Sequence, residues 1–213
     1  MERLSFEGIW QNINCLVPVY NEEGGNVTQV HLDDGRVLTD SRKICTVVKN
    51  LARVFTVDVE TARAKYSKLV DRKISVPVPL HQDLVLVPVK MRKPIAREDG
   101  AWGYVVLSKI VCYNKHPEKD NTIQIFFDNG HIDALLLTKS FQIILESAKK
   151  IHRAYRQLHL VSVIKDNDEV LNDEILKEEF IKYCVMPFVE RNLLHYRLMA
   201  KKEKERIQLS NKL

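Results

Sequence analysis

The chain has 213 residues, of which 45% are apolar, and this is enough to bury the core of one or two domains. Its formal net charge of +5 is only mildly basic, so the total charge by itself excludes no class of partner. The distribution is more informative, because residues 40–115 carry 15 Lys or Arg against 7 Asp or Glu. A phosphate backbone or an acidic partner is expected to meet this part of the chain, and an ordinary solvated surface is the alternative.

Two Asx-Gly pairs predict β-hairpins. Residues 6–20 alternate loosely and predict one or two opening strands, after which Asp34-Gly35 lies between two alternating runs. Asn129-Gly130 interrupts the apolar run TIQIFFDNGHIDALLL in the same way. Because glycine accepts a positive φ at little cost, both pairs suit a type I′ turn.

Two short helices are expected between the hairpins. Asp40 or Ser41 can cap a helix that continues to about Phe55, and Asp58 can cap a second helix over the run VETARAKYSKLV. The pair has no glycine turn and no typical recognition-helix pattern. The sequence therefore weakens, without excluding, a helix-turn-helix reading in the DNA major groove.

A proline-rich connector then leads into strands. Pro77 and Pro79 exclude a helix and a central strand, which leaves an extended connector. The run QDLVLVPVK predicts a strand, and Pro88 places that strand at a sheet edge or at its own end. The run AWGYVVLSKIVCY predicts the next strand.

The helix expected over Ser140–His159 is amphipathic. Its apolar residues repeat at helical spacing and predict a buried stripe: Phe141, Ile144, Leu145, Ala148, Ile151, Tyr155 and Leu158. Its cations project roughly opposite that stripe: Lys149, Lys150, Arg153 and Arg156, with Lys139 joining them at the start. Such a basic face either binds phosphates or is merely solvated.

Residues 161–213 differ in composition from the rest. They begin with the acidic stretch SVIKDNDEVLNDE and continue with helical apolar spacing that Pro187 interrupts. We therefore expect an α+β domain over residues 1–160, built on an antiparallel sheet or partly closed barrel with packed helices. A C-terminal helical extension over 161–213 would dock, dimerise or recruit a partner.

The sequence contains no recognisable catalytic or metal-binding motif. No Gly-rich phosphate loop, nucleophile elbow or HExxH is present, which disfavours an enzyme. The four cysteines have no CxxC or Cys/His spacing typical of zinc: Cys15, Cys45, Cys112 and Cys184. The remaining catalytic alternative combines His131 and Asp133, which share a strand face, with Cys45 or Cys112. No cofactor is expected.

Nothing in the sequence predicts secretion or membrane insertion. The start, MERLSFEGIW, lacks the apolar core of a signal peptide, and no stretch approaches about 18 uninterrupted apolar residues. We therefore expect a cytoplasmic protein with reduced thiols.

The first basic run offers better material for nucleic-acid binding. It places five cations within eleven residues, with Tyr66 among them: Arg63, Lys65, Lys68, Arg72 and Lys73. Cations near phosphates supply affinity, and an arginine inserted into a narrow A/T-rich minor groove supplies specificity through DNA shape.

The central block resembles the bacterial competence transcription factor family, the ComK-like proteins. The resemblance rests on the order of RKISVPVP, QDLVLVPVK, AWGYVVLSKI, IFFDNG and TKSFQIILESAKKIHRAY, and covers about residues 42–156. It implies a transcriptional activator that binds paired A/T-rich boxes in double-stranded DNA, largely through the minor groove, as an oligomer. It also implies a proteolytic adaptor, and RNA polymerase is a further candidate partner.

The resemblance also guides the site assignment. Arg63 matches the place of an arginine in the family pattern and is the best candidate for groove insertion, whereas Trp102 and Phe141 are assigned to the core. The chain departs from the pattern at TVDVETARAKY, where a glycine- and serine-rich stretch is expected, and over 165–213. These departures motivate the competing hypothesis, a protein-interaction module that keeps the fold without binding DNA.

Overall fold

The computed structural model describes residues 3–96 and 99–165, and side chains up to residue 159. The chain divides into two units, Met1–Ser162 and Val163–Leu213. The predicted helical extension, including the expected break at Pro187, lies outside the described residues. The predicted domain boundary at residues 160 and 161 therefore stays a prediction.

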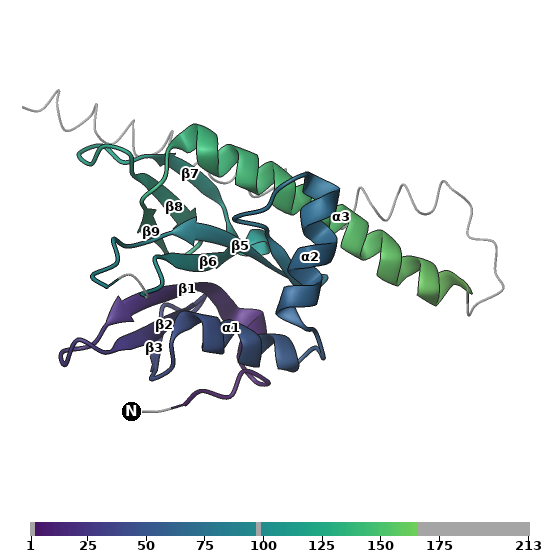
Figure 1. The fold of residues 1–213 in the computed structure, drawn as a ribbon, viewed down its shortest axis with the longest axis horizontal. Helices are drawn as coiled ribbons and strands as arrows, with labels where there is room; N and C mark the ends of the chain where they lie inside the picture. The colour runs from purple at the N-terminus through teal and green to yellow at the C-terminus, as the bar shows by residue number, and fades with distance from the viewer. Residues whose placement is uncertain (1–2, 97–98, 166–213) are drawn as a thin grey trace, which may run out of the picture. The chain divides into compact units, whose positions relative to one another are not determined.

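The larger of two antiparallel sheets has six strands in the order β3-β2-β1-β6-β5-β4 (Figure 1). Its strands are β1 (Ile13–Tyr20), β2 (Asn26–Leu32), β3 (Val37–Asp40), β4 (Val78–His81), β5 (Leu84–Lys90) and β6 (Trp102–Val106). The second sheet consists of β7 (Cys112–Lys115), β8 (Ile123–Phe127) and β9 (Gly130–Ala134). The predicted α+β class is confirmed, and the sheet is open and does not close into a barrel.

Three α-helices complete the described fold: α1 (Ile44–Arg53), α2 (Val59–Val70) and α3 (Thr138–Lys165). Two single-turn 3₁₀ helices, η1 (Trp10–Asn12) and η2 (Leu107–Lys109), flank strands. The predicted cap of α2 is confirmed, because the Asp58 carboxylate accepts a 2.7 Å hydrogen bond from the Thr61 backbone N–H. No described helix is both long and apolar enough to cross a membrane.

The start of α1 was predicted too early. The helix begins at Ile44, and its N-cap Lys43 makes no side-chain capping bond. Asp40, one of the two proposed caps, ends β3 and accepts hydrogen bonds from the backbone N–H groups of Leu4 and Arg42. A carboxylate engaged in this way cannot cap the helix.

Both predicted hairpins exist, but neither has the predicted type I′ turn. In the β2–β3 hairpin, Leu32 donates to the Arg36 carbonyl, which leaves a three-residue loop with Gly35 at φ 88°. In the β8–β9 hairpin, Phe127 pairs with Gly130, so the loop residues are Asp128 and Asn129. Gly130 lies in β9 without a positive φ.

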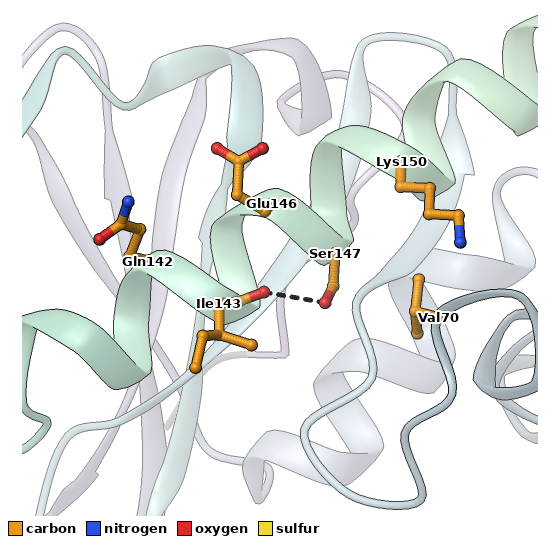
Figure 2. A pocket seen from close by; sticks show the side chains of 6 residues that line it. All are labelled: Val70, Gln142, Ile143, Glu146, Ser147 and Lys150. Carbon is orange, nitrogen blue, oxygen red and sulfur yellow. Dashed lines mark hydrogen bonds between the residues drawn. The ribbon is translucent and has the colours of Figure 1, made fainter.

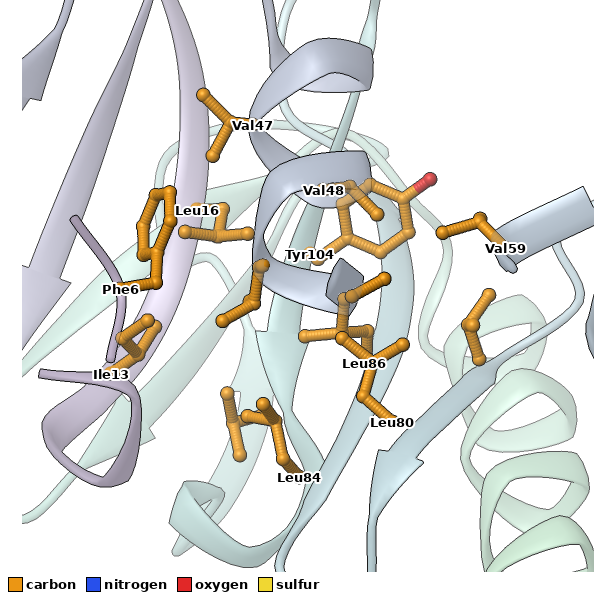
Figure 3. Packing of buried hydrophobic residues seen from close by; sticks show 14 of the residues in the cluster. Phe6, Ile13, Leu16, Val47, Val48, Val59, Leu80, Leu84, Leu86 and Tyr104 are labelled. Atoms are coloured by element: carbon orange, nitrogen blue, oxygen red, sulfur yellow. The ribbon is translucent and has the colours of Figure 1, made fainter. Parts of the chain in front are cut away.

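The central strands of the larger sheet are buried on both faces. Leu84 and Leu86 of β5 pack into a core against α1 and α2, whereas Val87 and Val89 pack into a second core with β8, β9 and α3. Figure 3 shows the first core, with side chains of α1 and α2 lying over those of β1, β5 and β6. Burial on both faces explains why β5 is an uninterrupted apolar run and does not alternate.

Three prolines, Pro77, Pro79 and Pro88, lie in or beside the strands β4 and β5. The predicted connector at Pro77 and Pro79 forms the short edge strand β4. The expectation that Pro88 marks an edge strand was wrong, because β5 lies between β4 and β6. The other expectation, that Pro88 marks a strand end, holds only on the side of β5 that faces β4. Pairing with β4 stops at Leu86, whereas pairing with β6 continues past Pro88.

The close approach of β1 and β6 requires a glycine in β6. A Cβ added at Gly103 would lie 2.5 Å from the Leu16 carbonyl oxygen and would also collide with the Met91 side chain. Trp102, which precedes it, is half-buried and pairs with Lys90, so its assignment to the core is only partly correct. Phe141, in contrast, is completely buried, as predicted.

Candidate nucleic-acid interface

Helix α2 turns one side into the core and leaves most of its cations in solvent. Val59, Ala62 and Tyr66 are buried, whereas Lys65 and Lys68 are exposed on the other side. The helix ends at Val70, its C-cap Asp71 has φ 50°, and the chain then leads to the half-buried Arg72 and the exposed Lys73. The N–H of Arg72 donates to the Ser67 carbonyl, and this bond fixes the start of the loop.

The Arg63 guanidinium is bound within the protein. It donates a hydrogen bond to the Tyr104 hydroxyl on β6 and lies 3.8 Å from the Glu60 carboxylate. Tyr104 is buried, which raises the pKa of its hydroxyl above the ordinary value. In this structure Arg63 therefore joins α2 to the sheet, and only a rearrangement would free it for groove insertion.

We expect Tyr104→Phe and Arg63→Ala to lower the free energy of unfolding by similar amounts, about 1–2 kcal/mol. Each change removes the same hydrogen bond, so that Arg63→Ala leaves the buried Tyr104 hydroxyl without it and Tyr104→Phe leaves the half-buried guanidinium without it. Urea unfolding would measure the losses, and the double variant should lose little more than either single variant. Fully additive losses would contradict a shared bond.

Helix α3 largely has the predicted amphipathic form. Phe141, Ile144, Leu145, Ala148 and Ile151 are buried and Tyr155 is half-buried.

Leu158 departs from the predicted stripe, because it is 53% exposed. The Tyr155 hydroxyl donates to the Leu80 carbonyl of β4, and His152 lies 2.7 Å from the Gln82 carbonyl oxygen. Leu158 comes a turn later than these contacts with the sheet edge, and the helix continues beyond the sheet (Figure 1).

The cations of α3 are not equally available. Lys139, Lys150 and Arg153 are exposed. Lys149 is half-buried and forms a 2.8 Å ion pair with Glu146. Arg156 is half-buried and is electrostatically coupled to His152, where it contributes to lowering the imidazole pKa after the larger effect of burial.

An open groove of about 370 Å³ lies where the end of α2 approaches α3. It is lined by Val70 from α2 and by Gln142, Ile143, Glu146, Ser147 and Lys150 from α3. Figure 2 shows Val70 next to Lys150 and Ser147, across the gap between the two elements. The groove thus places the end of the first basic run near the basic side of α3, although more than 65 residues separate the two segments in the chain.

A second polar cluster, which the sequence did not reveal, fixes the loop between β5 and β6. The Arg92 guanidinium lies 4.0 Å from the centre of the Tyr20 ring and donates to the Gly100 carbonyl. Asp99 accepts hydrogen bonds from the Ala96 N–H, Tyr20 and Asn26, and these lower the pKa of Asp99 to about 2. No local pattern links residues that are more than 70 positions apart.

The catalytic alternative finds little support in the geometry of the second sheet. Cys112, Phe126 and His131 form one row across β7, β8 and β9, so two strand spacings, about 10 Å, separate the thiol from the imidazole. Burial raises the pKa of Cys112 above its ordinary value, which disfavours a thiolate.

His131 and Asp133 share a strand face as predicted, but the Asp133 carboxylate is engaged elsewhere. It forms a 2.6 Å ion pair with Lys119 and lies 3.5 Å from His116. Burial alone would raise the pKa of Asp133, but the hydrogen bonds from Lys119 and Gln124 outweigh this effect and hold the pKa below its usual value. A carboxylate of this kind is a weak base.

The described residues define an open-sheet α+β protein with a basic, groove-bearing surface. Within them, no group of three or more His, Cys, Asp or Glu is placed to hold a metal ion. No protein-family model, curated protein or solved structure matches the chain.

Proposed function

We propose that the chain binds double-stranded DNA, prefers A/T-rich sites and acts as a transcriptional activator similar to the ComK-like competence regulators. The observation that carries the proposal is the approach of two basic segments, the end of α2 and the solvent side of α3, at one groove. Lys150 lines this groove, Arg153 is exposed three residues further along α3, and Lys68 and Lys73 are exposed on either side of Val70 in the chain. Cations gathered on one surface can neutralise several phosphates at once.

The packing of α3 favours backbone and minor-groove contact over major-groove reading. The helix buries one side against the sheets through Phe141, Ile144 and Ile151, so only its opposite side is free. A recognition helix normally presents its tip or most of its circumference to the major groove. A half-buried helix with exposed cations instead suits contact with the phosphate backbone of the duplex, which is compatible with recognition of DNA by its shape.

A protein-interaction module is the second candidate function. It is favoured by the apolar residues in the groove, since Ile143 is 58% exposed and Val70 lines the same groove. Phosphates gain nothing from such side chains, whereas a protein partner would cover them.

A salt-titrated binding assay on A/T-rich and G/C-rich duplexes tests the proposal. With four to five phosphates neutralised, the logarithm of the affinity should fall linearly with the logarithm of salt concentration, with a slope of about −4. Affinity should be higher for the A/T-rich duplex at every salt concentration. No binding to either duplex at low salt would refute DNA binding and leave the interaction module.

A further inference from the structure

The groove between α2 and α3 is lined by apolar, polar and charged side chains, and its one carboxylate, Glu146, is paired with Lys149 at 2.8 Å. Val70 and the exposed Ile143 supply the apolar part, and Lys150 lies at its edge. Lys68 and Lys73, on either side of Val70 in the chain, are exposed, as is Ile74 at 76%. A surface of this composition suits an amphipathic segment that carries carboxylates beside large apolar side chains.

The chain itself contains a segment with the complementary composition. Residues 166–179 include seven Asp or Glu and a single Lys. Leu176, Phe180 and Tyr183 follow at spacings of four and three, which is the spacing of one helical face. These residues lie outside the described part of the structure.

We propose that residues 166–183 of a second copy of the chain occupy the groove between α2 and α3. In a symmetric dimer each copy would offer its groove and receive the other copy's acidic segment, so the contact would be made twice. The apolar side chains of the segment would cover Val70 and Ile143, and the carboxylates of the segment would lie near Lys150. If the proposed DNA binding holds, this dimer would compete with DNA for the same cations.

A charge-exchange experiment on the full chain, without DNA, tests the dimer. One variant carries Lys150→Glu in the groove, and the other carries Glu174→Lys, Glu178→Lys and Glu179→Lys in the segment. Each variant alone should dimerise at least about tenfold more weakly, because like charges then meet at the contact. An equimolar mixture should recover the dimer, since both contacts in the mixed dimer again join opposite charges.

Sedimentation equilibrium over a range of protein concentrations would measure the association. Lys93→Glu, a charge reversal at an exposed residue of the β5–β6 loop, is the matched control and should leave the dimer unchanged. The proposal is overturned by a chain that stays monomeric throughout, or by groove and segment variants that associate like the control. The proposal is also overturned if the mixture of the two variants fails to dimerise while a single chain that carries both the groove and the segment changes dimerises like the wild type. That result would mean that the groove binds the segment of its own chain. DNA affinity is measured separately, so failure of the dimer leaves the proposed function untouched.

Discussion

Replacing Asp40 with alanine is expected to lower the free energy of unfolding by about 3–5 kcal/mol. The Asp40 side chain is fully buried and forms an ion pair with Arg42, whose side chain is 19% exposed. It also accepts a 3.0 Å hydrogen bond from the Leu4 N–H, and Arg42 donates to the Leu4 carbonyl. Removal of the carboxylate would leave a largely buried guanidinium unpaired and would release the N-terminal segment.

The chain offers a matched control for this prediction. Asp34 and Arg36 form an ion pair with the same two-residue spacing, but their side chains are 41% and 64% exposed. Because exposed pairs contribute little, Asp34→Ala should cost less than about 1 kcal/mol. Urea unfolding of the two variants would measure both losses, and equal losses would contradict the special role of Asp40.

The pH dependence of the free energy of unfolding should also show the contribution of the Asp40 carboxylate. Burial alone would raise the pKa of Asp40, but hydrogen bonds from Arg42 and Leu4 hold it below its ordinary value. A lowered folded-state pKa means that the ionised carboxylate stabilises the protein above about pH 4 and that this contribution is lost as the pH falls further. Asp40→Ala should therefore flatten the acid limb of the stability profile.

Burial could be predicted from the sequence wherever it follows the periodicity of the chain. Five apolar residues of α3 repeat at helical spacing from Phe141 to Ile151, and these five are buried: Phe141, Ile144, Leu145, Ala148 and Ile151. The Asp58 cap and the two hairpin positions could also be predicted from the sequence, because they depend on neighbours within a few residues. Leu158 continues the pattern but is exposed, since periodicity does not reveal where the supporting sheet ends.

Partners distant in sequence could not be predicted. Arg63 was expected to be free for DNA, yet its guanidinium binds Tyr104, 41 residues further along the chain. The approach of Val70 to α3 likewise depends on how two helices pack, which no local spacing determines. The turn types were wrong because loop length follows from strand register, and register is set by pairing across the whole hairpin.

Neutralising four exposed cations of α2, the loop after it and α3 should have the largest effect on DNA binding. The variant replaces these exposed residues with glutamine: Lys68, Lys73, Lys150 and Arg153. If each contacts a phosphate, the salt slope should become shallower by about 3 to 4, and affinity near 0.1 M salt should fall by roughly 10³ or more. Anisotropy titrations with one A/T-rich duplex would measure both quantities, and urea unfolding would show that the fold persists.

The control for this prediction must remove the same charge elsewhere. Four exposed cations outside α2, α3 and the loop after α2 provide it, also replaced with glutamine: Arg36, Lys43, Lys93 and Lys115. Both variants have the same net charge, so a purely long-range attraction would weaken binding equally in the two. A steep slope retained only by the control variant would locate the phosphate contacts at the α2–α3 surface. Equal losses would contradict that location while leaving DNA binding itself intact.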